Sequence, residues 1–333
     1  MKRRTRVFMF AAASVLMASV ATGLIAWATR VSAATATDEL AYVPADALMV
    51  GYADVRGLMN SPFHERIRQL QRTSPAAGAD DLEARTGIRF DTDIDGVLVA
   101  SSGGDAPQER AEGSLFIARG RFDAARIESV MRSRGGQVDQ YRGKRIVTLA
   151  NAASDTALAF AEPGLLLFGP QASVRGALDA KAGAAAAIGS NREFMTLVND
   201  VSDGTAWSVA KLDSASGRAP FPPALMNQLP PINWFAASGR VGTGLHGRLR
   251  AEARDVQSAE SLRDVIQGFL ALARMQGARD PAYRSMLDSV ALTADGTSVS
   301  LSFDVTPAAL DLLTPSGPGL RGPTASPDCE GRC

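Results

Sequence analysis

Three aspartates at alternate positions give this sequence its strongest likeness to a metal-binding loop. Asp91, Asp93 and Asp95 precede Gly96, which matches the first half of a calcium loop, where alternate carboxylates converge on the ion. The twelfth position of such a loop holds a bidentate glutamate, and here it is Ser102. An apolar strand follows in place of a helix, so we interpret the segment as an acidic turn leading into a sheet. Whether the three aspartates bind a cation stays open, and we assign no metal site.

A glycine pattern typical of dinucleotide binding occurs at Gly242-Thr-Gly244-Leu-His-Gly247. That fingerprint needs a strand before it and a helix after it, because the helix N-terminus meets the pyrophosphate. The residues that follow, 245–254, alternate with period two and predict a strand. We therefore interpret the pattern as a hairpin turn and expect no nucleotide cofactor.

The residues available for acid–base or nucleophilic chemistry are few and scattered. The chain has two histidines, His64 and His246, and no Gly-x-Ser-x-Gly nucleophile elbow. The acidic pair Glu260 and Asp264 lies one helical turn apart, as on a solvated helix face. We assign no catalytic residue and no cofactor, and expect a protein that is not an enzyme.

Two further segments invite a functional interpretation. The loop 214–233 is rich in proline and apolar residues; it can present a binding edge, but we favour its covering the core. Cys329 and Cys333 lie in the last residues, where a disulfide would close a very short loop, and their redox state stays open. We expect neither cysteine to have a structural role.

Charge and the N-terminal segment narrow the class of protein. The 333 residues contain 35 basic and 35 acidic side chains, and zero net charge argues against nucleic-acid or anionic-lipid partners. Residues 1–33 hold a basic start followed by the uncharged run 7–29, which fits either a cleaved signal peptide or a membrane anchor. Both alternatives place the body outside the cytoplasm, periplasmic or anchored to the inner membrane. Membrane contact is expected through this segment only.

The stretch Val290–Val305 predicts a β-hairpin. Its apolar residues alternate with Ser, Thr and Asp, and Asp295-Gly296 suits a two-residue type I′ turn. That turn predicts Leu292 opposite Val299 and Val290 opposite Leu301. A second hairpin is expected over 157–168.

The same spacing rules predict the other elements. Strands are expected over residues 47–55, 97–102, 114–121, 145–150, 205–212, 234–241 and 245–254, and helices over 56–72, 124–134, 171–181, 258–276 and 308–313.

The order of these elements repeats, which predicts an internal duplication. Residues 113–115 align with residues 247–249, and residues 168–170 align with residues 305–307, at nearly the same separation along the chain. We expect an α+β fold of two similar antiparallel-sheet-plus-helix units, with the helices on one face; the units can share one continuous sheet. The expected organisation is a signal or anchor at 1–33, a first repeat at 40–181, a linker at 181–190, a second repeat at 191–313 and a disordered Pro/Gly-rich tail at 314–333.

Two short motifs resemble those of bacterial exported proteins of unknown function. The run Tyr42-Val-Pro-Ala-Asp46 precedes a strand, and Gly120-Arg-Phe-Asp123 precedes a helix. In the exported proteins that this sequence resembles, a signal or anchor precedes a domain that begins with a Val-Pro-Ala-Asp type of segment. The resemblance implies an uncharacterised exported α+β protein and transfers no catalytic residue.

Three functions are compatible with these features. The first is a non-catalytic binding or structural protein of the cell envelope, whose partner would be an unknown envelope protein. The alternative is a periplasmic carrier of an apolar ligand such as a lipid, which needs an apolar cavity between the layers. The third, a hydrolase, needs convergent polar residues in one cleft.

Overall fold

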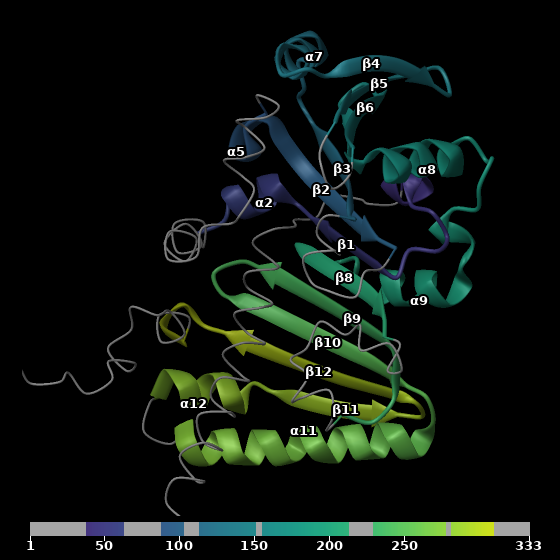
Figure 1. Cartoon of the computed structure of the whole chain (residues 1–333). Coiled ribbons are helices and arrows are strands. Elements are labelled where there is room, and N and C mark those ends of the chain that lie inside the picture. The colour runs from purple at the N-terminus through teal and green to yellow at the C-terminus, as the bar shows by residue number, and fades with distance from the viewer. Residues whose placement is uncertain are drawn as a thin grey trace, which may run out of the picture.

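Two antiparallel six-stranded sheets and their helices make up this α+β protein (Figure 1). The structure, a computed structural model, describes residues 38–62, 88–102, 113–150, 155–212, 229–277 and 281–309. One sheet has the order β2-β3-β7-β6-β5-β4 and the other the order β1-β8-β9-β10-β12-β11. The strands are β1 (Met49–Ala53), β2 (Ile94–Ser101), β3 (Leu115–Gly120), β4 (Gln137–Tyr141), β5 (Lys144–Leu149), β6 (Thr156–Glu162), β7 (Leu165–Pro170), β8 (Ala206–Lys211), β9 (Ile232–Val241), β10 (Leu245–Ala253), β11 (Ala291–Asp295) and β12 (Ser298–Val305).

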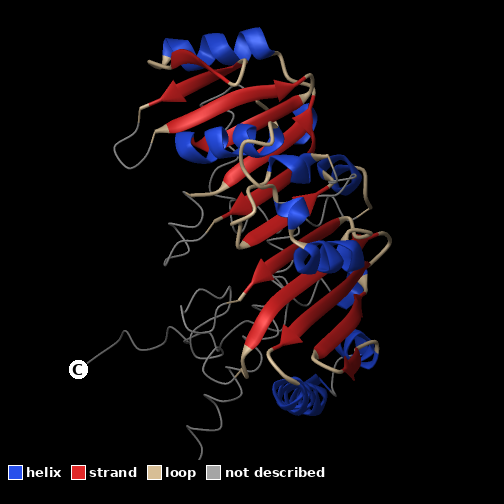
Figure 2. Cartoon of the chain, turned by 90° about the vertical axis from the view of Figure 1, so that its right-hand side faces the viewer, coloured by secondary structure: helices blue, strands red, loops and turns tan. Residues whose placement is uncertain are grey.

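Helices flank this layer of strands (Figure 2). They are η1 (Glu39–Tyr42), α2 (Val55–Met59), α5 (Phe90–Asp93), α7 (Ala124–Ser133), α8 (Gln171–Lys181), η2 (Ile188–Ser190), α9 (Arg192–Val201), α11 (Val256–Gly277) and α12 (Pro281–Asp288).

The two sheets meet where β1 lies beside β2. The backbone N–H of Leu48 donates to the carbonyl of Ser101 over 2.9 Å, and a Cβ on Gly96 would lie 3.3 Å from the carbonyl oxygen of Ala53. β1 itself pairs with β8, so a strand from the first predicted repeat is hydrogen-bonded to the second. A single continuous antiparallel layer of twelve strands fits this arrangement.

The first sheet is covered on both faces, which corrects the expectation of helices on one face. On β7, Leu165 and Leu167 lie in the cluster under α8, whereas Leu166 lies in the cluster under α7. Sequence alternation does not show this because β6 and β7 are apolar at consecutive positions. Such uninterrupted apolar runs are typical of strands that are buried on both sides.

The second sheet is covered differently on its two faces. α11 and α12 pack on one face, where Leu262, Met286 and Leu287 lie in apolar clusters with strand residues such as Val299. On the opposite face, α9 covers β8 and β9, and the Phe194 and Trp234 rings meet edge to face at 6.1 Å. Beyond β9, that second face continues onto the polar side chains of β10, β12 and β11.

The β11–β12 hairpin forms with a register that differs from the prediction. Leu292 lies opposite Leu301 and Ala294 opposite Val299, with Asp295 and Ser298 closing the turn. Gly296 has φ +55°, whereas the next residue, Thr297, does not have a positive φ. The turn is centred on residues 296 and 297, with glycine at the first central position and positive φ there alone, which is the arrangement of type II′ turns. The turn therefore moves by one residue and the pairing by two, which keeps the apolar set on one face.

The other turns follow the sequence closely. The hairpin predicted over 157–168 forms, with Phe160 opposite Leu166 and Gly164 at φ +73° at its tip. Arg142 and Gly143 both have positive φ, at 51° and 72°, which is the type I′ geometry. Val241 lies opposite Leu245, so the glycine-rich pattern at 242–247 is a hairpin turn followed by a strand.

Several elements were missed, and one segment differs from its expected role. β4, α9 and α12 lie where no element was predicted, at residues 137–141, 192–201 and 281–288, and so do the short helices η1, α5 and η2. The expected linker 181–190 is fixed to the core, because Ile188 is fully buried and its N–H donates to the carbonyl of Val43 over 2.8 Å.

The strand order in the two halves is the same over four strands. The order β2-β3-β7-β6 in the first sheet corresponds to the order β9-β10-β12-β11 in the second. A helix follows β3 in the chain, and another follows β10. The residues do not correspond as the sequence comparison placed them. Phe116 pairs with Phe168 and Leu245 with Val305. An overlay of Phe168 on Val305 therefore puts Phe116 on Leu245, whereas the sequence comparison put Leu115 on Leu249.

Several predictions lie outside the described residues. They concern the signal or anchor at 1–33, most of the helix 56–72 with His64, most of the loop 214–233, and the tail 314–333 with Cys329 and Cys333. Among the described helices, none has the length and apolar character needed to cross a bilayer.

Candidate functional site

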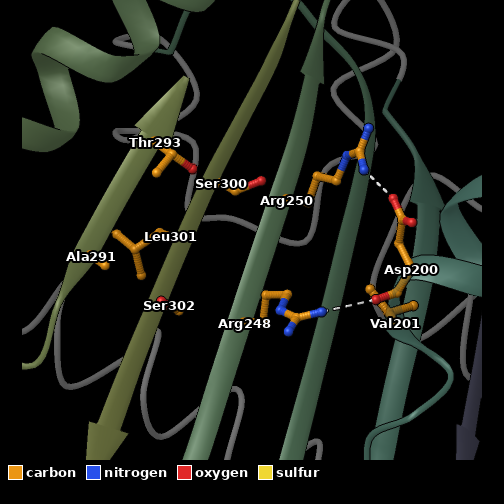
Figure 3. Close-up of a pocket in the computed structure, with 9 residues that line it drawn as sticks. All are labelled: Asp200, Val201, Arg248, Arg250, Ala291, Thr293, Ser300, Leu301 and Ser302. Atoms are coloured by element: carbon orange, nitrogen blue, oxygen red, sulfur yellow. Dashed lines mark hydrogen bonds and ion pairs between the residues drawn. The ribbon is translucent and has the colours of Figure 1, made fainter. Parts of the chain in front are cut away.

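A pocket of about 350 Å³ lies beside the C-terminal end of α9, on the part of that second face of the second sheet which no described helix covers (Figure 3). Its floor comes from β10, β12 and β11, and its wall from α9. The lining residues are Asp200, Val201, Arg248, Arg250, Ala291, Thr293, Ser300, Leu301 and Ser302.

Strand alternation and register bring the polar side chains together. Arg248 and Arg250 are two apart on β10 and so point to the same face. Arg248 lies opposite Ser302, and Arg250 lies opposite Ser300. Thr293 on β11 lies opposite Ser300 on its other side. The pocket floor therefore has two cross-strand rows, each starting at an arginine.

Arg250 is fixed by two carboxylates. Its guanidinium forms an ion pair with Asp200 of α9, and its Nε donates to Glu252 over 2.8 Å. Ion pairing on both sides neutralises Arg250 and ties the helix to the sheet.

Arg248 is held more loosely. Its Nη1 donates to the backbone carbonyl of Asp200 over 3.2 Å (Figure 3). Asp200 is in the last turn of α9, where carbonyls lack helical partners and a cation is favoured. Within the described part of the chain this is its only polar contact, which leaves most of its guanidinium donors open to the pocket.

The hydroxyls on the floor are also open. The side-chain hydroxyls of Thr293, Ser300 and Ser302 form no hydrogen bond with any residue that the structure describes. Each hydroxyl can donate one hydrogen bond and accept two. The pocket thus offers a cation and three hydroxyls that a polar ligand or partner can engage.

The described aspartates of the calcium-like segment are each paired with arginine. Asp93 accepts from the Arg89 backbone over 3.0 Å and from its side chain over 3.1 Å, and Asp95 forms an ion pair with Arg56. Burial alone would raise the pKa of Asp93, but the Arg89 hydrogen bonds hold it below its usual range. Among the described side chains, no group of His, Cys, Asp or Glu is placed to hold a metal ion. The side chain of Asp91 lies outside that description.

His246 contacts an acidic partner that sequence reasoning did not assign. Its Nδ1 lies 2.8 Å from Oδ1 of Asp304 on the neighbouring strand β12. Nε2 contacts no serine or cysteine among the described residues, so the pair lacks the nucleophile of a hydrolytic triad there. Glu260 and Asp264 are exposed on α11, as expected.

The pocket residues were not singled out from the sequence. Ser300 and Ser302 are among the polar residues that alternate with apolar ones in the predicted hairpin, but no site role was assigned to them, and Asp200 lies on the unpredicted helix α9. The signal for that helix is present: Asn191 caps it by accepting from Phe194 N over 3.1 Å, and apolar residues recur at 194, 197, 198 and 201. Sequence alone does not show that this helix end meets β10.

Comparisons with known proteins give no family for the chain. No protein-family model matches the sequence, and no curated protein matches it significantly. Two solved structures resemble it, both of TP0453. Crystal form III has a TM-score of 0.49 and 13% identity, covering 80% of this chain and 93% of that one. Crystal form IV has a TM-score of 0.44 and 12% identity, covering 82% and 94%. A likeness at this level carries no inference about function.

Proposed function

We propose that this chain is an exported, non-catalytic binding protein of the bacterial cell envelope, which engages its partner through the open face of β10, β12 and β11. The observation that carries the proposal is the pocket beside α9, where Arg248 and three hydroxyls have no side-chain partner among the described residues. Polar groups that a fold leaves unused on a concave surface are available for recognition.

The proposal is supported by the contrast between the two halves, which we infer to be duplicated units. In the first, α8 packs Val174, Ala177 and Leu178 over the strands β6 and β7. In the second strand order, β11 and β12 take the places that β6 and β7 have in the first. They carry Thr293, Ser300 and Ser302 on the face that corresponds to the one covered by α8. A face that is apolar and covered by a helix in one unit is polar in the other, where no described helix covers it.

The pocket favours this function over the apolar carrier. A carrier of a lipid needs an apolar cavity between the layers, whereas this pocket is lined mainly by charged and hydroxyl side chains.

Site-specific photo-crosslinking in the native cells tests the binding face. A photoreactive residue in place of Ala291, which is exposed in the pocket, should give a discrete adduct identifiable by mass spectrometry. The matched control is the same residue in place of Ala271, which is exposed on α11 and packs on the opposite face of the sheet. Equal labelling at both positions, or none at Ala291, would contradict the proposal.

Export is tested separately. Alkaline phosphatase fused after residue 309 folds to an active form only outside the cytoplasm, because its disulfides require an oxidising compartment. We expect activity from the fusion that carries residues 1–309 and none after deletion of residues 1–33. An inactive fusion of residues 1–309 would refute export.

A further inference from the structure

The unused groups of the pocket are one cation that only donates hydrogen bonds and three hydroxyls that can donate or accept. Arg248 has five guanidinium N–H groups and cannot accept, and one of them is taken by the carbonyl of Asp200. The hydroxyls of Thr293, Ser300 and Ser302 can each donate one further hydrogen bond. A ligand that accepts hydrogen bonds can therefore engage all four groups, whereas a ligand that only donates cannot engage Arg248.

The register and the direction of Arg248 together enclose one part of the pocket floor. Arg248 and Ser302 are direct cross-strand neighbours, and Ala291 is the next residue in the same row. The Arg248 side chain extends from its strand toward Asp200, whereas Ser302 lies on the opposite side of Arg248 (Figure 3). A ligand group that contacts both therefore lies between the guanidinium and the Ser302 hydroxyl. Ser300 and Thr293 form the adjacent row.

Charge distinguishes the two arginines. Arg250 lies between Asp200 and Glu252 and is neutralised. Arg248 forms no ion pair with any residue that the structure describes, so its charge is available. Asp200 and Glu252 share Arg250, so these two carboxylates and the two arginines together carry no net charge, and the positive charge that lacks a carboxylate partner among the described residues is that of Arg248.

We propose that this pocket binds an oxyanion of the ligand, a phosphate or a carboxylate, between the guanidinium of Arg248 and the hydroxyl of Ser302. Ser300 and Thr293 contact the neighbouring atoms of the same ligand. Arg248 is the anchor, because a planar guanidinium binds such groups through two parallel hydrogen bonds. A pocket of about 350 Å³ exceeds one such group, so the oxyanion is part of a larger molecule. The inference rests on the proposed function, in that it specifies what the open face recognises.

Calorimetric titration of the full chain in detergent tests the inference. The probes are inorganic phosphate and acetate, each against sodium chloride at equal ionic strength, so the two arms identify the oxyanion. We expect saturable binding of at least one probe, and a loss of about tenfold or more in affinity for Arg248→Ala, since that change removes a charge-assisted contact. The matched control is Arg192→Ala, which removes the same charge from the exposed other end of α9 and should bind as the wild type does.

Several outcomes would overturn the inference. These are no binding of either probe by the wild type, or equal affinity in wild type and Arg248→Ala. If Arg248→Ala does not fold by circular dichroism, Ser302→Ala replaces it, and unchanged affinity there counts against the inference as well. If the wild type binds neither anion but the adduct at Ala291 persists, the proposed ligand class is wrong and the proposed binding face stands. If the wild type binds an anion but no adduct forms at Ala291, the proposed function is wrong.

Discussion

Glu39 and Arg119 form the most buried ion pair of the described chain, and they show how single residues hold the start of the fold. Arg119 Nε contacts Oε1 of Glu39, and the Glu39 side chain is only 2% exposed against 39% for Arg119. The other carboxylate oxygen of Glu39, Oε2, is buried and accepts no hydrogen bond from any described residue. The pair joins η1 to β3, and it depends on its cation, because a buried unpaired carboxylate is costly.

Removal of the cation should therefore destabilise the protein strongly. We expect Arg119→Met to lower the free energy of unfolding by about 3 kcal/mol, because it leaves the Glu39 charge buried. The double variant Glu39→Gln, Arg119→Met should recover most of that loss. Urea denaturation of the three proteins measures both, and a double variant less stable than Arg119→Met would contradict the account.

Tyr42 and Glu162 give a pH-dependent contribution. The Tyr42 hydroxyl donates to Glu162 over 2.8 Å and lowers the pKa of that carboxyl, while burial and then this same contact raise the pKa of Tyr42. A depressed carboxyl pKa means that the contribution is present above the ordinary Glu pKa and is lost as pH falls through the folded value. Tyr42→Phe should thus destabilise more at pH 7 than at pH 3. A loss that is equal at both pH values, measured by urea denaturation, would refute the assignment.

At the scale of elements, turn glycines decide where strands pair. Gly296 and Gly164 both have positive φ, but a Cβ on Gly164 would also lie 2.9 Å from the carbonyl oxygen of Gly120. The β6–β7 turn is thus packed against β3, whereas the β11–β12 turn is open. A glycine with positive φ therefore serves only the turn itself in the β11–β12 hairpin, whereas in the β6–β7 hairpin it also allows the turn to pack against β3.

The two glycines should respond differently to substitution. Gly296→Ala should cost about 1 kcal/mol from its left-handed backbone, and Gly164→Ala about 2 kcal/mol or more, because the carbonyl contact is added. Gly189→Ala, with neither feature, should change stability by less than about 0.5 kcal/mol. Thermal unfolding ranks the three variants, and an equal cost for Gly296→Ala and Gly164→Ala would argue against the close packing.

For the whole molecule, one apolar cluster joins the two sheets. It contains Leu167 of β7 in the first sheet and Val209 of β8 in the second, together with Leu197 of α9. Because β1, which comes from the N-terminal half of the chain, is the edge strand of the second sheet, neither half has a core of its own at this face. The pocket is therefore supported by packing that extends into the first half.

A shared core predicts a single cooperative unfolding transition. Leu167→Ala and Leu197→Ala should each lower stability by about 3 kcal/mol and move the same transition, although they lie in different halves. Calorimetry tests this. Two transitions, each sensitive to only one of the substitutions, would show that the halves unfold independently.

Local sequence determined the features that depend on neighbouring residues. The alternation over 291–305, the cap at Asp123 and the glycine after α7 predict a hairpin and a helix that the structure shows, because turn and cap chemistry act within a few residues. The wet face of Ser300 and Ser302 followed from the same alternation. Tertiary structure alone decided that β1 pairs with β8, that β7 is covered on both faces, and that Asp200 meets Arg248 and Arg250. These contacts join residues far apart in the chain, and they depend on how apolar faces pack rather than on any short pattern. The candidate site was invisible to sequence reasoning for that reason: it exists only where a helix end approaches a strand about fifty residues away.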